Sequence, residues 1–311
     1  MDLKQLETFV HVAELGSFTR AANALQTAQP ALSRQVRLLE VELRQSLFER
    51  TGRGVVLTEA GKRLLAHGRV ILAQVERALQ DLEDQRGAAT GRLVIGLPPS
   101  VSRQLTGSLV AAFRERFPKA TLSVVEGLST YLLEWLALGR IDCAVAYNVT
   151  PAGSLDLRPV LVEPLYLVSA RSGAGGRGED GPLVGPPATL AEVAERQLVI
   201  PSRPHSMRML LESALANEGR RARVGFEIES IPAILDLVRG HAMHAVLPRN
   251  ALPTADARHF ELRTIGTPPL AATLWIASSA QRPPGPLLGP SIELVTQLMP
   301  SIWSMPDRDN S

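Results

Sequence analysis

The sequence predicts an α+β protein of several domains: an N-terminal winged helix-turn-helix, one long helix, and then an α/β region. Three observations predict this organisation. Residues 1–58 contain short apolar repeats of helical spacing, joined by tight turns and followed by a glycine-containing hairpin. Residues 59–87 carry a single apolar stripe, and from residue 91 onward short apolar runs alternate with amphipathic helices. At roughly 100–150 residues per domain, 311 residues are enough for two or three cores.

Composition excludes several classes of protein. No apolar run approaches the ~20 residues that cross a bilayer, and the first ten residues lack the apolar core of a signal peptide, so we expect a cytoplasmic protein that does not enter membranes. The single cysteine, Cys143, excludes an internal disulfide and a cysteine zinc cluster, and we expect it to be a small buried hydrophobe. A net charge of +2 says little about nucleic acid, but no acid lies between Ser17 and Val36.

The first 43 residues predict three helices. Apolar spacing predicts a helix over 3–14 that ends at Gly16, and Ser17 is placed to cap the second helix. A short turn at Gln26 and Thr27 precedes the third helix, for which Thr27 is a plausible N-cap. Pro30 is tolerable because it falls in the first turn, where backbone N–H groups lack intrahelical partners. Two helices joined by a tight turn form a helix-turn-helix.

The third helix leaves a polar and cationic face exposed, made of Gln29, Pro30, Ser33, Arg34 and Arg37. This set suits a DNA major groove, because Gln and Arg make bidentate contacts to base edges and Pro offers apolar surface to a thymine methyl. The alternative is an ordinary solvated face.

Residues 48–58 predict a wing, a short hairpin around Gly52 and Gly54 with Arg53 at its tip. A cation there is placed to reach phosphates or the minor groove. A solvated turn with an incidental arginine is the alternative.

Thr58 is placed to cap a long helix that runs to about Gln85 and ends at Gly87. Its apolar stripe repeats at spacings of four and three, through Leu64, Gly68, Ile71, Val75, Ala78 and Leu82. Such a seam favours a dimerisation helix. A dimer would place the helix-turn-helix domains of two chains about one DNA turn, or a multiple of it, apart. The alternative is a helix that lies on its own domain.

The region after Gly91 alternates strands and helices and predicts α/β units on largely parallel sheets. The predicted strands are 93–97, 121–126, 141–147, 164–169, 197–201, 222–229, 244–247 and 270–277. The predicted helices include 102–116, 130–138 and 290–303.

Three segments that follow strands are candidates for a ligand site, because ligands of such sheets bind beyond the carboxyl ends of strands, where helix N-termini point. The candidate residues are Ser100, Val101, Ser102, Ser129, Thr130, Pro201, Ser202, Arg203 and His205. Hydroxyls near helix starts suit a small anion, especially a carboxylate, and Ser100 and Ser202 are the first candidates. Each hydroxyl has the alternative role of an N-cap, and Arg203 and His205 have that of a solvated loop.

Enzymatic chemistry is not expected. The chain has no G-x-S-x-G elbow, no P-loop and no H-E-x-x-H helix. The G-x-G-x-x-G match at residues 173–178 is followed by Glu179-Asp180-Gly181-Pro182 rather than by a helix, so we expect a surface loop there. No cofactor is expected.

Residues 17–40 resemble the DNA-binding motif of LysR-type transcriptional regulators, and residues 47–61 resemble the wing of that family. The resemblance implies that Gln29, Pro30, Ser33 and Arg34 approach base edges while Arg53 enters the flanking groove. The full candidate DNA-contacting set is Thr27, Gln29, Pro30, Ser33, Arg34, Arg37, Arg50 and Arg53. Residues 227–231 resemble a strand of the branch that includes nitrogen-assimilation-control regulators. The stretch 240–248 has only one of the two glycines that family members often carry, which puts any ligand contact there in doubt.

The resemblance also implies a periplasmic-binding-protein-like effector domain of two lobes, with crossovers near residues 162 and 266. The expected domains are 1–58, a linker helix 59–87, and an effector domain 92–303 whose second lobe is about 163–265.

The expected protein is a sequence-specific transcriptional regulator modulated by a small anionic metabolite. Its expected partners are an interrupted palindrome of double-stranded DNA, RNA polymerase, and further copies of itself in a dimer or tetramer. A constitutive regulator without ligand, and a solute-binding protein, are the alternatives.

Overall fold

The computed structural model describes residues 1–51, 54–84, 91–171, 183–240, 243–282 and 284–303. The chain divides into two compact units, the first chiefly residues Met1–Ala88 and the second most of the chain from Ala89. Several predicted features lie outside the described residues: Arg53 at the wing tip, the side chains of Arg50 and Leu82, and the glycine-rich loop 173–178.

The first unit is a three-helix bundle followed by a hairpin and a long helix. Its elements are α1 (Leu3–Leu15), α2 (Phe18–Ala24), α3 (Gln29–Leu43), β1 (Phe48–Thr51), β2 (Gly54–Leu57) and α4 (Glu59–Asp84). Ser17 is the N-cap of α2 as predicted, its hydroxyl accepting from the amide of Arg20 at 3.4 Å. The predicted N-cap of α3 is wrong: Ala28 holds that position without a side-chain cap, because α3 starts at Gln29 with Pro30 in its first turn.

The wing is held against the turn between α1 and α2. Val55 donates its amide to the carbonyl of Gly16 at 3.2 Å. Gly54 has φ +146°, and a Cβ built there would lie 2.6 Å from the Gly16 oxygen. Phe48 of β1 adds ring contacts to Phe9 and Phe18 at 5.3 and 5.8 Å between centroids. A side chain at position 54 is therefore excluded by both backbone conformation and space.

The first half of α4 packs on α1 of the same unit. Thr58 caps α4 as predicted, with its hydroxyl accepting from the Gly61 amide at 3.0 Å. Gly68 faces Leu6 and Val10 of α1 so closely that an added Cβ would lie 3.0–3.1 Å from them. Leu64 packs on the same buried cluster. Gly68 is therefore buried against α1 and Leu64 half-buried on it within the chain, so α1 shares these two positions of the predicted dimer seam.

The second unit is built on a mixed sheet in the order β4-β3-β5-β12-β6-β11-β7, with β10 also paired to β6. Its strands are β3 (Gly91–Leu97), β4 (Ala120–Glu126), β5 (Cys143–Tyr147), β6 (Leu155–Ala170), β7 (Leu183–Val184), β10 (Ala245–Pro248), β11 (Phe260–Thr264) and β12 (Ala271–Ser279), and β8 (Gln197–Ile200) and β9 (Arg223–Glu227) form a separate pair. The predicted parallel arrangement is confirmed for β3 with β4 and β5 and for β8 with β9. It is wrong for β12, which runs antiparallel to both β5 and β6.

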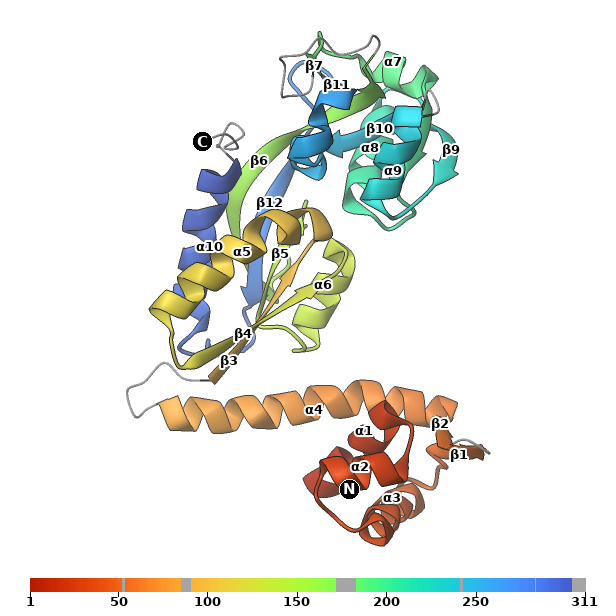
Figure 1. The fold of residues 1–311 in the computed structure, drawn as a ribbon, viewed down its shortest axis with the longest axis vertical. Coiled ribbons are helices and arrows are strands. Elements are labelled where there is room, and N and C mark those ends of the chain that lie inside the picture. Colours follow the sequence, from red (N-terminus) through yellow and green to blue (C-terminus); the bar gives the residue numbers. More distant parts are fainter. Residues whose placement is uncertain (52–53, 85–90, 172–182, 241–242, 283, 304–311) are drawn as a thin grey trace. The chain divides into compact units, whose positions relative to one another are not determined.

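The long strand β6 passes through both lobes of this unit (Figure 1). Its first part, Leu155–Pro164, pairs with β12, and its second part pairs with β10 and β11. Sequence analysis predicted only residues 164–169, because the alternation of charged and apolar residues over 155–162 belongs to a half-exposed strand rather than a buried run.

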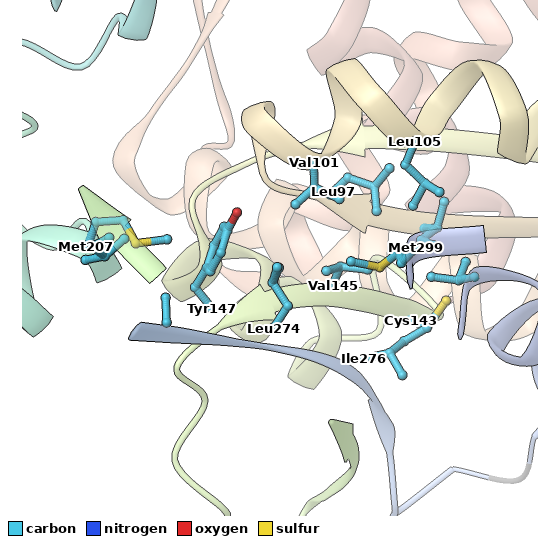
Figure 2. Close-up of a cluster of buried hydrophobic side chains, with 14 of the residues drawn as sticks. Leu97, Val101, Leu105, Cys143, Val145, Tyr147, Met207, Leu274, Ile276 and Met299 are labelled. Carbon is cyan, nitrogen blue, oxygen red and sulfur yellow. The ribbon is translucent and has the colours of Figure 1, made fainter. Parts of the chain in front are cut away.

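Helices cover the sheet of each lobe. They are α5 (Pro99–Arg116), α6 (Ser129–Ala137) and α10 (Leu288–Trp303) in the first lobe, and α7 (Leu190–Glu195), α8 (Ser206–Asn217) and α9 (Ile231–Gly240) in the second. Leu97, Val101, Leu105 and Met299 belong to the main buried cluster (Figure 2). Cys143 is fully buried, as predicted, and burial raises the pKa of its thiol well above its usual value.

Candidate functional site

The candidate DNA-reading face is the exposed side of α3. Gln29, Pro30, Arg34 and Arg37 are exposed, and Ser33 is half-buried. The Gln29 amide donates to the Ser33 hydroxyl at 2.9 Å, so these two side chains present one polar surface. Thr27 is exposed in the turn before α3.

A hollow adjoins this face between α3 and the wing. Arg34, Arg37 and Arg44 line it together with Glu40. The carboxylate of Glu40 is already occupied, because it accepts the amides of Leu47 and Phe48 at 2.7 and 3.3 Å. Glu40 thereby fixes the start of the wing relative to α3, while the arginines keep their charge on the surface.

The second unit contains a cleft between its two lobes, with a volume of about 440 Å³. The first lobe contributes Pro98, Pro99, Ser100, Arg103, Glu126, Leu128, Ser129 and Tyr147. The second lobe contributes His205, Ser206, Met207, Glu229, Ser230, Ile231, Pro232, Leu247, Pro248 and Ala251. The N-terminal residues of four helices, α5, α6, α8 and α9, are in this lining. Helix N-termini carry unpaired N–H groups and partial positive charge, which favour an anion, whereas the carboxylates of Glu126 and Glu229 in the same lining oppose one.

Three of the predicted ligand residues line the cleft. They are Ser100, Ser129 and His205. The Ser129 hydroxyl accepts the amide of Tyr147 at 3.0 Å and is buried. The His205 ring caps α8 by accepting from the Met207 amide at 3.3 Å, and burial lowers the pKa of His205 to about 4. A neutral imidazole that accepts at Nδ1 carries its proton on Nε2, which leaves one donor for a ligand.

Val101 and Ser102 do not line the cleft. The helix was expected to start at 102, but Pro98 and Pro99 start it three residues earlier, so Val101 and Ser102 fall on its buried side. Figure 2 shows Val101 beside Leu97 and Leu105 in the core. The Ser102 hydroxyl bonds that of Thr106 at 3.1 Å.

The remaining predicted residues surround the cleft without lining it. The Thr130 hydroxyl donates to the Pro204 carbonyl at 3.4 Å, and the Pro201 carbonyl accepts from Arg208. Arg203 is 64% exposed and forms an ion pair with Glu212 at 2.7 Å. Ser202 is half-buried and absent from the lining. Pro201, Arg203 and Pro204 of the turn before α8 therefore make their polar contacts with α8 and α6 rather than with the cleft.

Sequence reasoning missed a polar cluster that starts in the cleft lining, at Ser100 and Tyr147, and continues to buried Glu163 and Asn250. Tyr147 donates its hydroxyl to Glu163 at 2.7 Å and lies 3.3 Å from the Ser100 hydroxyl. Glu163 also accepts from the Trp303 indole at 3.0 Å and from the Asn250 amide at 3.3 Å. Burial raises the pKa of Glu163, an effect that its three donors oppose, and burial raises the pKa of Tyr147 strongly. A signal was present, because Tyr147 and Asn250 each stand at or just beyond the carboxyl end of a strand.

Neither a site for a metal ion nor a helix that could span a membrane is found in the described part of the chain. Within the described ranges, no group of three or more His, Cys, Asp or Glu side chains is placed to hold a metal ion. Over the same ranges, no helix combines the length and apolarity needed to cross a bilayer.

Comparison with known families identifies the class of protein. Residues 3–62 match the bacterial regulatory helix-turn-helix protein, lysR family, and residues 86–300 match the LysR substrate binding domain. The chain therefore belongs to the LysR family: it is a DNA-binding transcriptional regulator with a substrate-binding domain, and not an enzyme. This membership overturns the alternative of a solute-binding protein.

Within the family, the predicted branch is confirmed. The chain is 33% identical to the nitrogen assimilation regulatory protein nac of Klebsiella aerogenes, across 100% of this chain and 98% of that one. Identity to the nac protein of Escherichia coli K12 is also 33%, across 98% and 96%.

Solved structures show the same fold. Full-length CbnR complexed with its target DNA has a TM-score of 0.70 at 24% identity, covering 96% of this chain and 99% of that one. Full-length OxyR from Pseudomonas aeruginosa has a TM-score of 0.66 at 21% identity, covering 100% and 99%. At these identities the likeness concerns the fold alone.

Proposed function

We propose that this regulator reads an interrupted DNA palindrome with α3 and the wing, and responds to a small carboxylate or similar anion in the cleft between its lobes. The observation that carries the ligand proposal is the meeting of four helix N-termini in one cleft. The observation that supports the DNA proposal is the exposed set Gln29, Arg34 and Arg37 on α3.

The cleft suits an anion for three reasons that act together. Helix N-termini favour negative charge, the hydroxyls of Ser100, Ser129 and Ser230 are donors, and Arg103 supplies a full positive charge. Two carboxylates, Glu126 and Glu229, also line the cleft, but both are exposed and therefore solvated and screened. The three serine hydroxyls and the guanidinium of Arg103 offer donors to an anion.

Ligand binding would act by changing the angle between the lobes. A ligand that contacts both lobes stabilises one relative orientation, and it shifts the population by its difference in affinity for the two orientations. We infer that this change alters the spacing of reading heads in a dimer or tetramer, and with it DNA bending and contact with RNA polymerase. Because a DNA-binding regulator must reach DNA in the cell, we also infer that the protein works in the cytoplasm.

The DNA proposal is tested by titrating the full-length protein against its own upstream intergenic duplex and a scrambled duplex at one fixed salt concentration. We expect Arg34→Ala to lower the ratio of specific to random affinity by roughly 5- to 150-fold, the range for one bidentate base contact. Arg63→Ala, which removes an exposed arginine of α4, is the matched control and should leave the ratio unchanged. Equal losses on both duplexes for Arg34→Ala would assign Arg34 to the phosphates instead.

The ligand proposal is tested by calorimetric titration of the same protein with succinate and with inorganic phosphate. Saturable binding that Ser100→Ala weakens supports an anion in the cleft. A protein that binds neither probe, yet discriminates its upstream DNA, would favour the constitutive, ligand-free alternative.

A further inference from the structure

Asn250 of the second lobe is tied by four hydrogen bonds, three to residues of the first lobe and one to Glu163 of the crossover strand β6. Its backbone carbonyl accepts from Arg103 Nη2 at 2.7 Å and from Gln104 Nε2 at 3.0 Å, both on α5. Its side-chain amide donates to the Tyr147 hydroxyl and to Glu163, each at 3.3 Å. Asn250 is 7% exposed and lies in a short 3-10 turn that follows β10 directly. One buried residue of the second lobe is therefore fixed to α5, β5 and β6 at once.

Arg103 belongs both to this tie and to the cleft. It lines the cleft and is an exposed residue, and its Nη2 donates to the Asn250 carbonyl. A guanidinium has five N–H donors in a planar fork, so the bond to the carbonyl leaves further donors on a side chain that lines the cleft. Among the described residues, no acid forms an ion pair with Arg103. Partial burial lowers the pKa of Arg103, and no neighbouring acid opposes that shift.

We propose that Arg103 is the residue through which an anion in the cleft fixes the angle between the lobes. The anion takes the free N–H groups of the guanidinium while Nη2 stays on the Asn250 carbonyl. Binding therefore restrains the side chain that already joins α5 to the second lobe. The ligand class that suits this role is a carboxylate or phosphate, whose two oxygens match the fork of an arginine. This inference rests on the proposed anion-binding function of the cleft.

A variant at Gln104 can weaken the bonds of Asn250 to α5 without changing a residue that lines the cleft. Gln104 donates to the same carbonyl as Arg103 but does not line the cleft. A change at Gln104 therefore weakens the tie with the ligand-facing charge kept, whereas a change at Arg103 removes both. Arg114, also on α5, is an arginine that does not line the cleft and is the matched control for loss of positive charge.

The tie is measurable as a distance between the lobes in the full-length protein. Val110 of α5 and Met209 of α8 are 45% and 46% exposed, so cysteines at these positions accept spin labels. The native Cys143 is buried and stays unlabelled. Pulsed electron resonance on Val110→Cys/Met209→Cys protein, diluted with unlabelled chains to suppress distances between subunits, gives the interlobe distribution with and without succinate or phosphate.

We expect succinate or phosphate to narrow the distribution of interlobe distances in the otherwise wild-type labelled protein. Arg103→Gln should broaden it without ligand, lower affinity by roughly tenfold or more, as for a lost charged hydrogen bond, and abolish the narrowing. Gln104→Leu should broaden the ligand-free distribution while affinity changes by less than about threefold, a loss smaller than that of one neutral hydrogen bond. Arg114→Gln should behave as wild type.

The outcomes separate this inference from the proposed function. If wild type and Arg103→Gln bind the probe equally, or if the ligand-free distributions of Arg103→Gln and Gln104→Leu match that of wild type, the role of Arg103 is overturned and the anion cleft stands. If the wild type binds neither succinate nor phosphate, the anion cleft and the role of Arg103 are overturned together.

Discussion

Replacement of Gly54 by alanine tests how the wing is held. The new Cβ would lie 2.6 Å from the Gly16 carbonyl oxygen, about 0.8 Å inside ordinary contact. The obstacle is backbone, so it cannot rotate away, and φ at position 54 is +146°, where a residue with a side chain is strained. Strain of this kind costs about 1–3 kcal/mol, and relief requires the wing to leave Gly16, with loss of the 3.2 Å hydrogen bond from Val55.

The assay can be confined to the affected unit. All three tryptophans, Trp135, Trp275 and Trp303, belong to the second unit, so tryptophan fluorescence in urea reports on that unit alone. Hydrogen exchange of peptides from residues 1–58 reports on the first unit. For Gly54→Ala we expect exchange protection in those peptides to fall by about 1–3 kcal/mol, the fluorescence transition to stay unchanged, and affinity for the upstream duplex to fall.

Gly107→Ala is the matched control. Gly107 lies inside α5, with nothing within 4 Å of an added Cβ. Alanine there should stabilise the second unit by about 0.5–1 kcal/mol, since it removes backbone entropy from the unfolded chain. The fluorescence midpoint should therefore rise while DNA affinity stays the same. Wild-type protection and wild-type DNA affinity in Gly54→Ala would refute the close approach of the wing to Gly16.

Two further predictions concern the cleft. Ser129→Ala removes the buried acceptor of the Tyr147 amide and should destabilise the second unit by about 1–3 kcal/mol, measured as a lower fluorescence midpoint in urea, with no change in protection of residues 1–58. The folded pKa of His205 is about 4, below its usual value of 6.5, so the unfolded chain takes up the proton first as pH falls. The contribution of neutral His205 to the free energy of unfolding is complete above about pH 6.5. It is lost as the pH falls toward 4, by up to about 3 kcal/mol. His205→Asn keeps a capping side chain and should flatten this part of the pH profile; an unchanged profile would assign the loss to other groups.

The N-terminal unit was predictable because its information is local. Helical spacing, the cap at Ser17 and the turn before α3 lie within a few residues of the structures that they determine. The linker helix was only half predictable. Leu64 and Gly68 form an apolar stripe, and a stripe has the same spacing whether it packs on a partner or on α1. Whether the stripe packs on α1 depends on Leu6 and Val10, which lie more than 50 residues away in the sequence.

The cleft was predictable in position and less so in detail. Ser100, Ser129 and His205 follow strands and begin helices, which is a rule of topology. The rule does not say which side of a helix faces the cleft, so Val101 and Ser102 were placed in the site although they face the core. Glu163 carries no signal of this kind, because its burial results from the pairing of β6 with a strand more than 100 residues later.

The path of the chain limits how the two lobes can move. β6 continues from one lobe into the other, and the second crossover is bonded to it where the lobes meet. Leu165 donates to the Leu270 carbonyl at 2.8 Å, and Ile265 donates to the Leu165 carbonyl at 3.3 Å. Sliding of one lobe past the other would break these bonds, whereas a small rotation about them would not. We therefore expect a ligand in the cleft to change the angle between the lobes. The bonds at Leu165 thus act as a hinge between the lobes. Asn250 lies in the second lobe away from this hinge, and its bonds to α5 join the lobes at a second place. The bonds at Leu165 and the bonds of Asn250 together define the angle between the lobes. Loss of the Asn250 bonds should therefore broaden the distribution of interlobe distances, while residues 160–170 stay protected from hydrogen exchange.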